Sequence, residues 1–108
     1  MGLMVTSLGL MGEYVKWFKP NYRSKSLQAL VQLNSYPVCL DPSRAMGLAL
    51  HTDSSLLTLF NQSNTSGLQV LHGNNGWVIV PPLTGALAVN VGDLMHILSN
   101  GRFKTTLH

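Results

Sequence analysis

The sequence predicts a mainly β fold, an all-β barrel or sandwich that follows an amphipathic helix. Short apolar segments recur at intervals of roughly ten residues and are separated by turn-forming residues, a pattern typical of small β folds. The 108 residues are 45% hydrophobic and 10% charged, so the chain has enough apolar side chains for a core. The length corresponds to about one domain, since domains typically contain roughly 100–150 residues.

An amphipathic helix is expected at the start of the chain. Its apolar residues follow steps of four and three, the spacing of one helical face: Met4, Leu8, Met11, Val15 and Phe18. Pro20 ends the pattern, because proline lacks the amide hydrogen that a helix interior needs. Residues 19–27 are polar and read as a connection. We therefore assign residues 1–26 to the helix and its connection.

The β pattern lies in residues 27–108. Residues 27–36 alternate between two faces before Pro37, as a strand does. Further strands are expected at 48–60, 68–71, 77–80, 86–91 and 103–108, with turns or loops at 41–47, 61–67, 72–76 and 100–101 and a short helical segment at 94–98. The last strand has no closing partner after it, so the sequence predicts part of a barrel.

His51 and Asp53 are the first candidates for a functional site. They are two residues apart, so on a strand their side chains point to the same face. An imidazole and a carboxylate that converge can hold a divalent metal. A second histidine would complete a two-histidine, one-carboxylate set, which leaves positions open on non-haem Fe(II). The pattern leaves that histidine open among His72, His96 and His108.

Charge and cysteine content restrict the partners and the compartment. The net charge is +3, but the basic residues are scattered, so no nucleic-acid partner is expected. Cys39 is the single cysteine, which excludes an internal disulfide and fits a reducing, cytoplasmic location. Its thiol is expected in the core. No apolar run reaches the roughly 18–20 residues of a membrane span, so no membrane association is expected. A monomer is expected.

Six short motifs occur in order along the chain. They are Asn34–Cys39 (N-S-Y-P-V-C), His51–Asp53, Gly67–Val70, Trp77–Pro81, Asn90–Asp93 and Ser99–Gly101. Together they resemble the plant iron- and 2-oxoglutarate-dependent dioxygenases. Residues 33–48, 64–67 and 96–101 look more narrowly like the gibberellin 3-oxidising branch of that family. The resemblance implies a partial double-stranded β-helix (jelly roll) over residues 27–108.

The resemblance also implies the site residues. In this family the second histidine follows the S-N-G turn, and His108 lies 55 residues after Asp53. His51, Asp53 and His108 are therefore expected to bind Fe(II), with no catalytic residue beyond these ligands, and the other two histidines are expected to be non-ligands. Asn34 and Tyr36 match the N-x-Y motif whose tyrosine contacts 2-oxoglutarate. From the residues alone, Tyr36 reads instead as a core aromatic.

The implied cofactors are Fe(II), 2-oxoglutarate and O₂, with ascorbate in a supporting role. The implied reaction is hydroxylation of a gibberellin precursor, a small diterpenoid acid, at its 3β position. The R-x-S motif, whose arginine binds the distal carboxylate of 2-oxoglutarate in the family, does not occur after His108. The chain is thus expected to be a fragment that ends at the third iron ligand and begins after the native start. Alone, it is expected to bind metal weakly and turn over little.

Three alternatives remain at this stage. The chain could be a truncated, non-catalytic remnant that binds a small acid or a partner. It could belong to another plant 2-oxoglutarate dioxygenase that acts on a flavonoid or a different specialised metabolite. It could also be a cupin-type metal-binding barrel, although the N-x-Y-P and S-N-G motifs argue against this interpretation.

Overall fold

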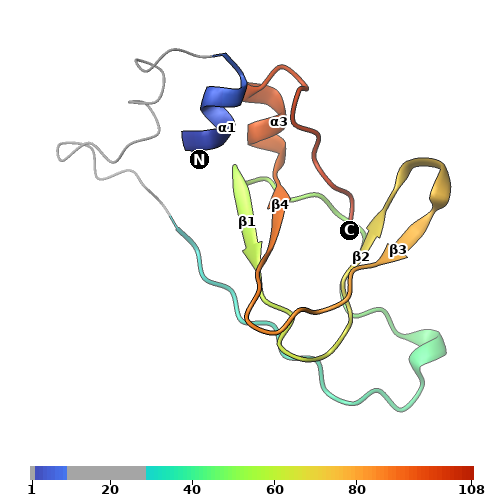
Figure 1. The fold of residues 1–108 in the computed structure, drawn as a ribbon. Coiled ribbons are helices and arrows are strands. Elements are labelled where there is room, and N and C mark those ends of the chain that lie inside the picture. The colour runs from blue at the N-terminus through green and yellow to red at the C-terminus, as the bar shows by residue number, and fades with distance from the viewer. Residues whose placement is uncertain (1, 10–28) are drawn as a thin grey trace. The chain divides into compact units, whose positions relative to one another are not determined.

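The structure, a computed structural model, describes residues 2–9 and 29–108 (Figure 1). Contacts divide the chain into two compact units, Met1–Gly47 and Leu48–His108. None of the helices within the described ranges is long and apolar enough to cross a membrane.

The first unit contains little regular structure in its described part. Helix α1 spans Gly2–Ser7 and is followed by Gly9 with φ of 71°, a left-handed conformation common after helix ends. A 3-10 helix at Pro42–Arg44 lies inside the turn that the sequence predicts at 41–47. Most of the predicted amphipathic helix lies outside the described residues, including Met11, Val15 and Phe18.

The predicted strand at 27–36 is wrong over its described residues. Residues 29–37 form no strand, and the side chains of Leu30 and Leu33 are 91% and 93% exposed. A strand needs a neighbour that accepts and donates backbone hydrogen bonds, and no described strand pairs with this segment. Cys39 is exposed as well, so the expectation of a core thiol is also wrong.

The second unit is built from two antiparallel pairs of strands (Figure 1). Strand β1 (Leu57–Phe60) pairs with β4 (Ala88–Val91) in a register that places Leu57 opposite Val91. Strand β2 (Gln69–Leu71) and β3 (Trp77–Ile79) form a hairpin around a 3-10 turn at Gly73–Asn75. The mainly β class and the hairpin that the sequence predicts are confirmed.

The predicted strand at 48–60 is shorter than expected, and the strand predicted at 103–108 is absent. Of residues 48–60 only β1 is a strand, and residues 103–108 contain none. The physical reason is that several carbonyl groups before β1 are paired outside a regular sheet ladder. Three of them, at Asp53, Ser55 and Leu56, accept hydrogen bonds from the amides of residues 92–94, which follow β4.

Helix α3 (Asp93–Leu98) follows β4 directly and carries the best-buried side chain among the described residues. Met95 is 1% exposed, and Ser99 after the helix is 4% exposed. Asn100 and Gly101 then turn the chain with positive φ values of 52° and 76°. The turn predicted at this position is therefore confirmed, and it directs the last residues back along the unit.

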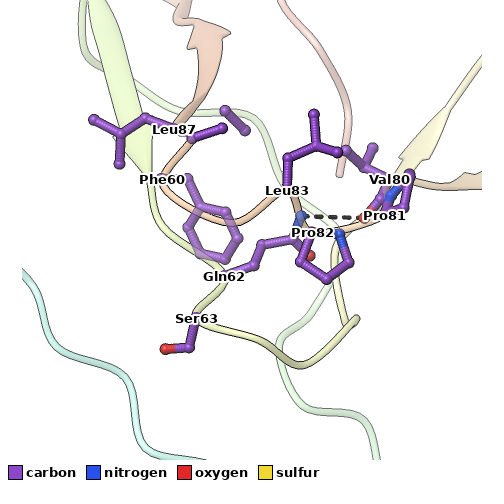
Figure 2. Close-up of a pocket in the computed structure, with 10 residues that line it drawn as sticks. Phe60, Gln62, Ser63, Val80, Pro81, Pro82, Leu83 and Leu87 are labelled. Atoms are coloured by element: carbon purple, nitrogen blue, oxygen red, sulfur yellow. Dashed lines mark hydrogen bonds between the residues drawn. The ribbon is translucent and has the colours of Figure 1, made fainter.

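Gln62 joins the end of β1 to the hairpin. Its Nε2 donates a hydrogen bond to the Val80 carbonyl at 3.1 Å, and its Oε1 accepts one from the Leu68 amide at 3.2 Å. Gln62 lines a pocket of about 130 Å³ together with Phe60 and Leu83, and Figure 2 shows these side chains. Both hairpin ends are thus tied to the residue that leaves β1.

Candidate metal centre

The structure brings His51, Asp53 and His108 together. Asp53 Oδ1 lies 3.9 Å from His51 Nε2, and Asp53 Oδ2 lies 3.8 Å from His108 Nε2. One ligand atom from each residue lies within 4.8 Å of the others. Among the described residues, this is the group of three or more histidine, cysteine or acidic side chains that could hold a metal ion.

Backbone pairing places the two histidines side by side. The His51 amide donates to the His108 carbonyl at 3.0 Å, and the His108 amide donates to the His51 carbonyl at 3.0 Å. This reciprocal exchange is the hydrogen-bonded pair of an antiparallel ladder, in which the two Cα atoms lie roughly 5.5 Å apart. The two imidazole centroids are 4.5 Å apart. The Leu71 amide also donates to the Leu107 carbonyl at 2.9 Å, which ties the same segment to β2.

Both histidines have the same tautomer, as their hydrogen bonds show. His51 Nδ1 lies 2.8 Å from the Ala49 carbonyl oxygen, and His108 Nδ1 lies 3.0 Å from the Thr106 carbonyl oxygen. A carbonyl oxygen only accepts, so each Nδ1 carries the hydrogen when the ring is neutral. Each Nε2 then presents its lone pair to Asp53, the arrangement that a histidine ligand adopts.

The Asp53 carboxylate is incompletely satisfied by the protein. Its Oδ2 is buried and has no hydrogen-bond partner, although a buried polar atom without a partner carries a desolvation cost. The two Nε2 atoms at 3.8 and 3.9 Å are too distant for hydrogen bonds. A divalent cation would satisfy all three groups at once, and two imidazoles with one carboxylate are a donor set that suits Fe(II). The residues therefore fit the metal.

Residues 92–94 hold the loop that carries Asp53. The Asp93 amide donates to the Asp53 carbonyl at 2.7 Å, and Thr52 Oγ1 donates to Asp93 Oδ2 at 2.9 Å. A Cβ atom on Gly92 would lie 2.0 Å from the Ser55 carbonyl oxygen, so only glycine allows this approach. Thr52, Gly92 and Asp93 lie in the His51–Asp53 and Asn90–Asp93 motifs of the sequence, but no role was predicted for them. The available signal was Gly92 itself, because a glycine between a predicted strand and a helical segment often marks a close approach of two backbones.

The other two histidines lie outside the cluster. His72 is exposed in the hairpin turn, and its Nδ1 lies 3.1 Å from Asn75 Nδ2. His96 is on α3, with Nδ1 at 2.8 Å from the Phe103 carbonyl oxygen. Their hydrogen bonds are local, and neither ring joins Asp53.

Asn34 and Tyr36 belong to the other unit, Met1–Gly47. Asn34 Oδ1 accepts a hydrogen bond from Gln32 Nε2 at 2.8 Å. Tyr36 is 59% exposed, so it is not a core aromatic within its unit. Their role as 2-oxoglutarate contacts stays a prediction.

Comparison with known proteins decides the family. The profile of the 2OG-Fe(II) oxygenase superfamily matches residues 27–108, which is most of the chain and contains all three residues of the cluster. The chain belongs to the 2OG-Fe(II) oxygenase superfamily.

Relatives of this oxygenase carry a specific name. Over 108 residues, it is 56% identical to gibberellin 3-beta-dioxygenase 1 of Arabidopsis thaliana and 54% identical to gibberellin 3-beta-dioxygenase 1 of Pisum sativum. Gibberellin 3-beta-dioxygenase 2 of Arabidopsis thaliana is 52% identical over the same length. All of this chain is covered in these comparisons, but it spans only 29–31% of the length of these relatives.

Proposed function

We propose that this oxygenase domain binds Fe(II) through His51, Asp53 and His108 and belongs to a 2-oxoglutarate-dependent dioxygenase. The observation that carries the proposal is the buried, unpartnered Oδ2 of Asp53 between two histidines whose Nε2 atoms face it. A carboxylate in this position gains little from the protein alone. Metal coordination gives it the partner that it lacks.

The protein's contribution is to hold the three ligands before the metal arrives. The paired amides and carbonyls of His51 and His108 set the distance between the rings, and the Nδ1 hydrogen bonds to Ala49 and Thr106 set their orientation and tautomer. A pre-arranged site loses less conformational entropy on binding. Bound Fe(II), with 2-oxoglutarate and O₂, supplies the oxidising power for hydroxylation of a C–H bond.

We further propose a gibberellin-type diterpenoid acid as the small-molecule substrate, hydroxylated at the 3β position. The support is the identity of 52–56% to three proteins named gibberellin 3-beta-dioxygenase. This identity extends across both units of the chain and favours gibberellin over a flavonoid or another specialised metabolite. The jelly-roll form of the sheet, over residues 27–108, is proposed on the family match.

Several finer features are proposed from the sequence pattern alone. Asn34 and Tyr36 are the proposed contacts to 2-oxoglutarate, since they match the family's N-x-Y motif. Ascorbate is proposed to sustain turnover, and a monomeric, cytoplasmic protein is proposed. The lone cysteine fits a reducing compartment.

The metal centre is tested by anaerobic titration with Fe(II) in the presence of 2-oxoglutarate. Chelation by the cofactor gives a weak visible charge-transfer band, which we expect in the parent chain and not in His51→Ala. His72→Ala is the matched control, because it removes a histidine from the exposed hairpin turn, and it should keep the band. Persistence of the band in His51→Ala would contradict the proposed ligand set, and absence of the band in both would show that this chain alone does not form a working site.

The substrate is tested by incubating the protein with Fe(II), 2-oxoglutarate, O₂ and a gibberellin precursor that lacks the 3β-hydroxyl group. Mass spectrometry should detect a product heavier by one oxygen atom, together with succinate. Asp53→Ala is the negative control, and a flavonoid is the competing substrate. Metal binding without hydroxylation of the precursor would support the non-catalytic interpretation, while hydroxylation of the flavonoid alone would move the protein to another branch of the family.

A further inference from the structure

The segment Gly92–Leu94 lies across the loop that carries Asp53. Three consecutive amides of this segment each donate to a carbonyl of the loop: Gly92 to Leu56 at 3.1 Å, Asp93 to Asp53 at 2.7 Å and Leu94 to Ser55 at 3.3 Å. No regular strand forms at residues 51–56. These three hydrogen bonds therefore replace a sheet ladder in holding the loop.

A side-chain contact adds to this backbone contact. Thr52, which lies between the two proposed ligands of the loop, donates its hydroxyl hydrogen to Asp93 Oδ2 at 2.9 Å. Both side chains are half-buried, and a hydrogen bond to a charged acceptor is roughly twice as strong as a neutral one. Asp93 thus contacts the loop twice, through its amide at Asp53 and through its carboxylate at Thr52.

The close approach depends on Gly92. Its backbone packs so near the Ser55 carbonyl group that an added Cβ would lie 2.0 Å from the oxygen and 2.6 Å from the carbon. Strand β4 fixes this segment from the other side, because Val91 pairs with Leu57. The end of β4 is therefore rigidly connected to the residues that flank Asp53.

We propose that Asp93 is a positioning residue that acts through the Thr52 hydroxyl to orient His51 and Asp53 for metal binding. The inference rests on the proposed metal centre. The Thr52–Asp93 hydrogen bond restrains the residue between the two ligands, next to the His51 backbone that exchanges hydrogen bonds with His108. Partners one step removed from the ligands typically change metal affinity by roughly 10–100-fold.

The test is titration with Co(II), an oxygen-stable probe whose visible spectrum reports on its ligands, without any measurement of activity. Thr52→Val and Asp93→Ala should each weaken Co(II) binding by roughly 10–100-fold. The double variant should bind Co(II) with about the same affinity as the single variant that binds it more weakly. The reason is that both changes remove the same hydrogen bond. Thr52→Ser and Asp93→Asn keep a donor and an acceptor and should recover most of the affinity.

Thr58→Val is the matched control, because its hydroxyl bonds only to the Ser55 hydroxyl at 3.0 Å and should leave Co(II) binding unchanged. Circular dichroism is used to choose a temperature at which every variant is folded. Co(II) binding is then compared at that temperature. Unchanged Co(II) affinity and spectrum in folded Thr52→Val would overturn the positioning role while leaving the metal centre intact. Failure of the parent itself to bind Co(II) would overturn the metal centre and the positioning role together.

Discussion

The metal centre and the β2–β3 hairpin each contain histidine Nδ1 hydrogen bonds, but they obtain their partners from different distances along the chain. In the hairpin, His72 contacts Asn75, and its amide donates to Gly76 at 2.9 Å. In the metal centre, His51 and His108 exchange both of their backbone hydrogen bonds, although 57 residues separate them in the sequence.

This difference separates a local turn from a functional site. The hairpin can form from neighbouring residues, so a change there should have a local effect. The metal centre combines distant parts of the chain, because the Gly92–Leu94 segment holds the loop of Asp53 and the C-terminal segment supplies His108, which pairs with His51. Its ligands should therefore be sensitive to changes well outside the cluster.

Loss of Asp53 is expected to have the largest effect on metal binding. Asp53→Ala removes the only negative charge of the cluster, and Co(II) affinity should fall by more than the roughly 10–100-fold typical of residues outside the ligand set. Asp41→Ala is the matched control, since Asp41 is exposed before the 3-10 helix and its carboxylate accepts a local hydrogen bond from Ser43 Oγ. Comparable affinity of Asp53→Ala and Asp41→Ala in isothermal titration would remove Asp53 from the ligand set.

A methyl group at Gly92 should affect both folding and metal binding. Gly92→Ala drives a Cβ into the Ser55 carbonyl, and overpacking of this kind typically costs about 1–3 kcal/mol. Gly67→Ala is the control, because no heavy atom lies within 4 Å of the position its Cβ would occupy, and it should change stability by less than about 0.5 kcal/mol. Urea unfolding measures the stability of both variants. Equal midpoints would show that the close approach at Gly92 does not contribute to stability.

The His96 side chain is expected to have an intermediate effect. His96→Ala removes the hydrogen bond to the Phe103 carbonyl at 2.8 Å, which helps to direct the chain after α3 toward His108. A hydrogen bond of this kind contributes about 0.5–1.5 kcal/mol, so thermal unfolding should occur at lower temperature and Co(II) affinity should fall slightly. The exposed neighbour Ile97 provides the control, since Ile97→Ala should change neither.

His72→Ala should have the smallest effect. The side chain is exposed and its hydrogen bond is confined to the hairpin turn, so stability should change by less than about 0.5 kcal/mol. Co(II) affinity should not change. A large loss of metal binding in this variant would mean that the hairpin is not independent of the metal centre, and the contrast between the two regions would no longer hold.

Sequence reasoning worked best where the local pattern and the tertiary contacts agree. The hairpin around residues 72–76 and the turn at Asn100 and Gly101 follow from turn chemistry, and both are present. It failed at residues 29–36, the described part of the strand predicted at 27–36, where alternation of apolar and polar side chains did not produce a strand. Alternation selects a face but supplies no backbone partner, and that segment has none among the described strands.

The sequence by itself determined which side chains are capable of holding a metal: a histidine and an aspartate two residues apart, and three further histidines as candidates for the third position. The residue pattern left that position open and the family resemblance pointed to His108; the tertiary structure brings His108, and not His72 or His96, to Asp53. It also placed Thr52 and Asp93 in contact across 41 residues. The reason is that long-range pairing depends largely on backbone hydrogen bonds. Almost every residue can make them whatever its side chain, so the sequence gives little indication of which residues will pair.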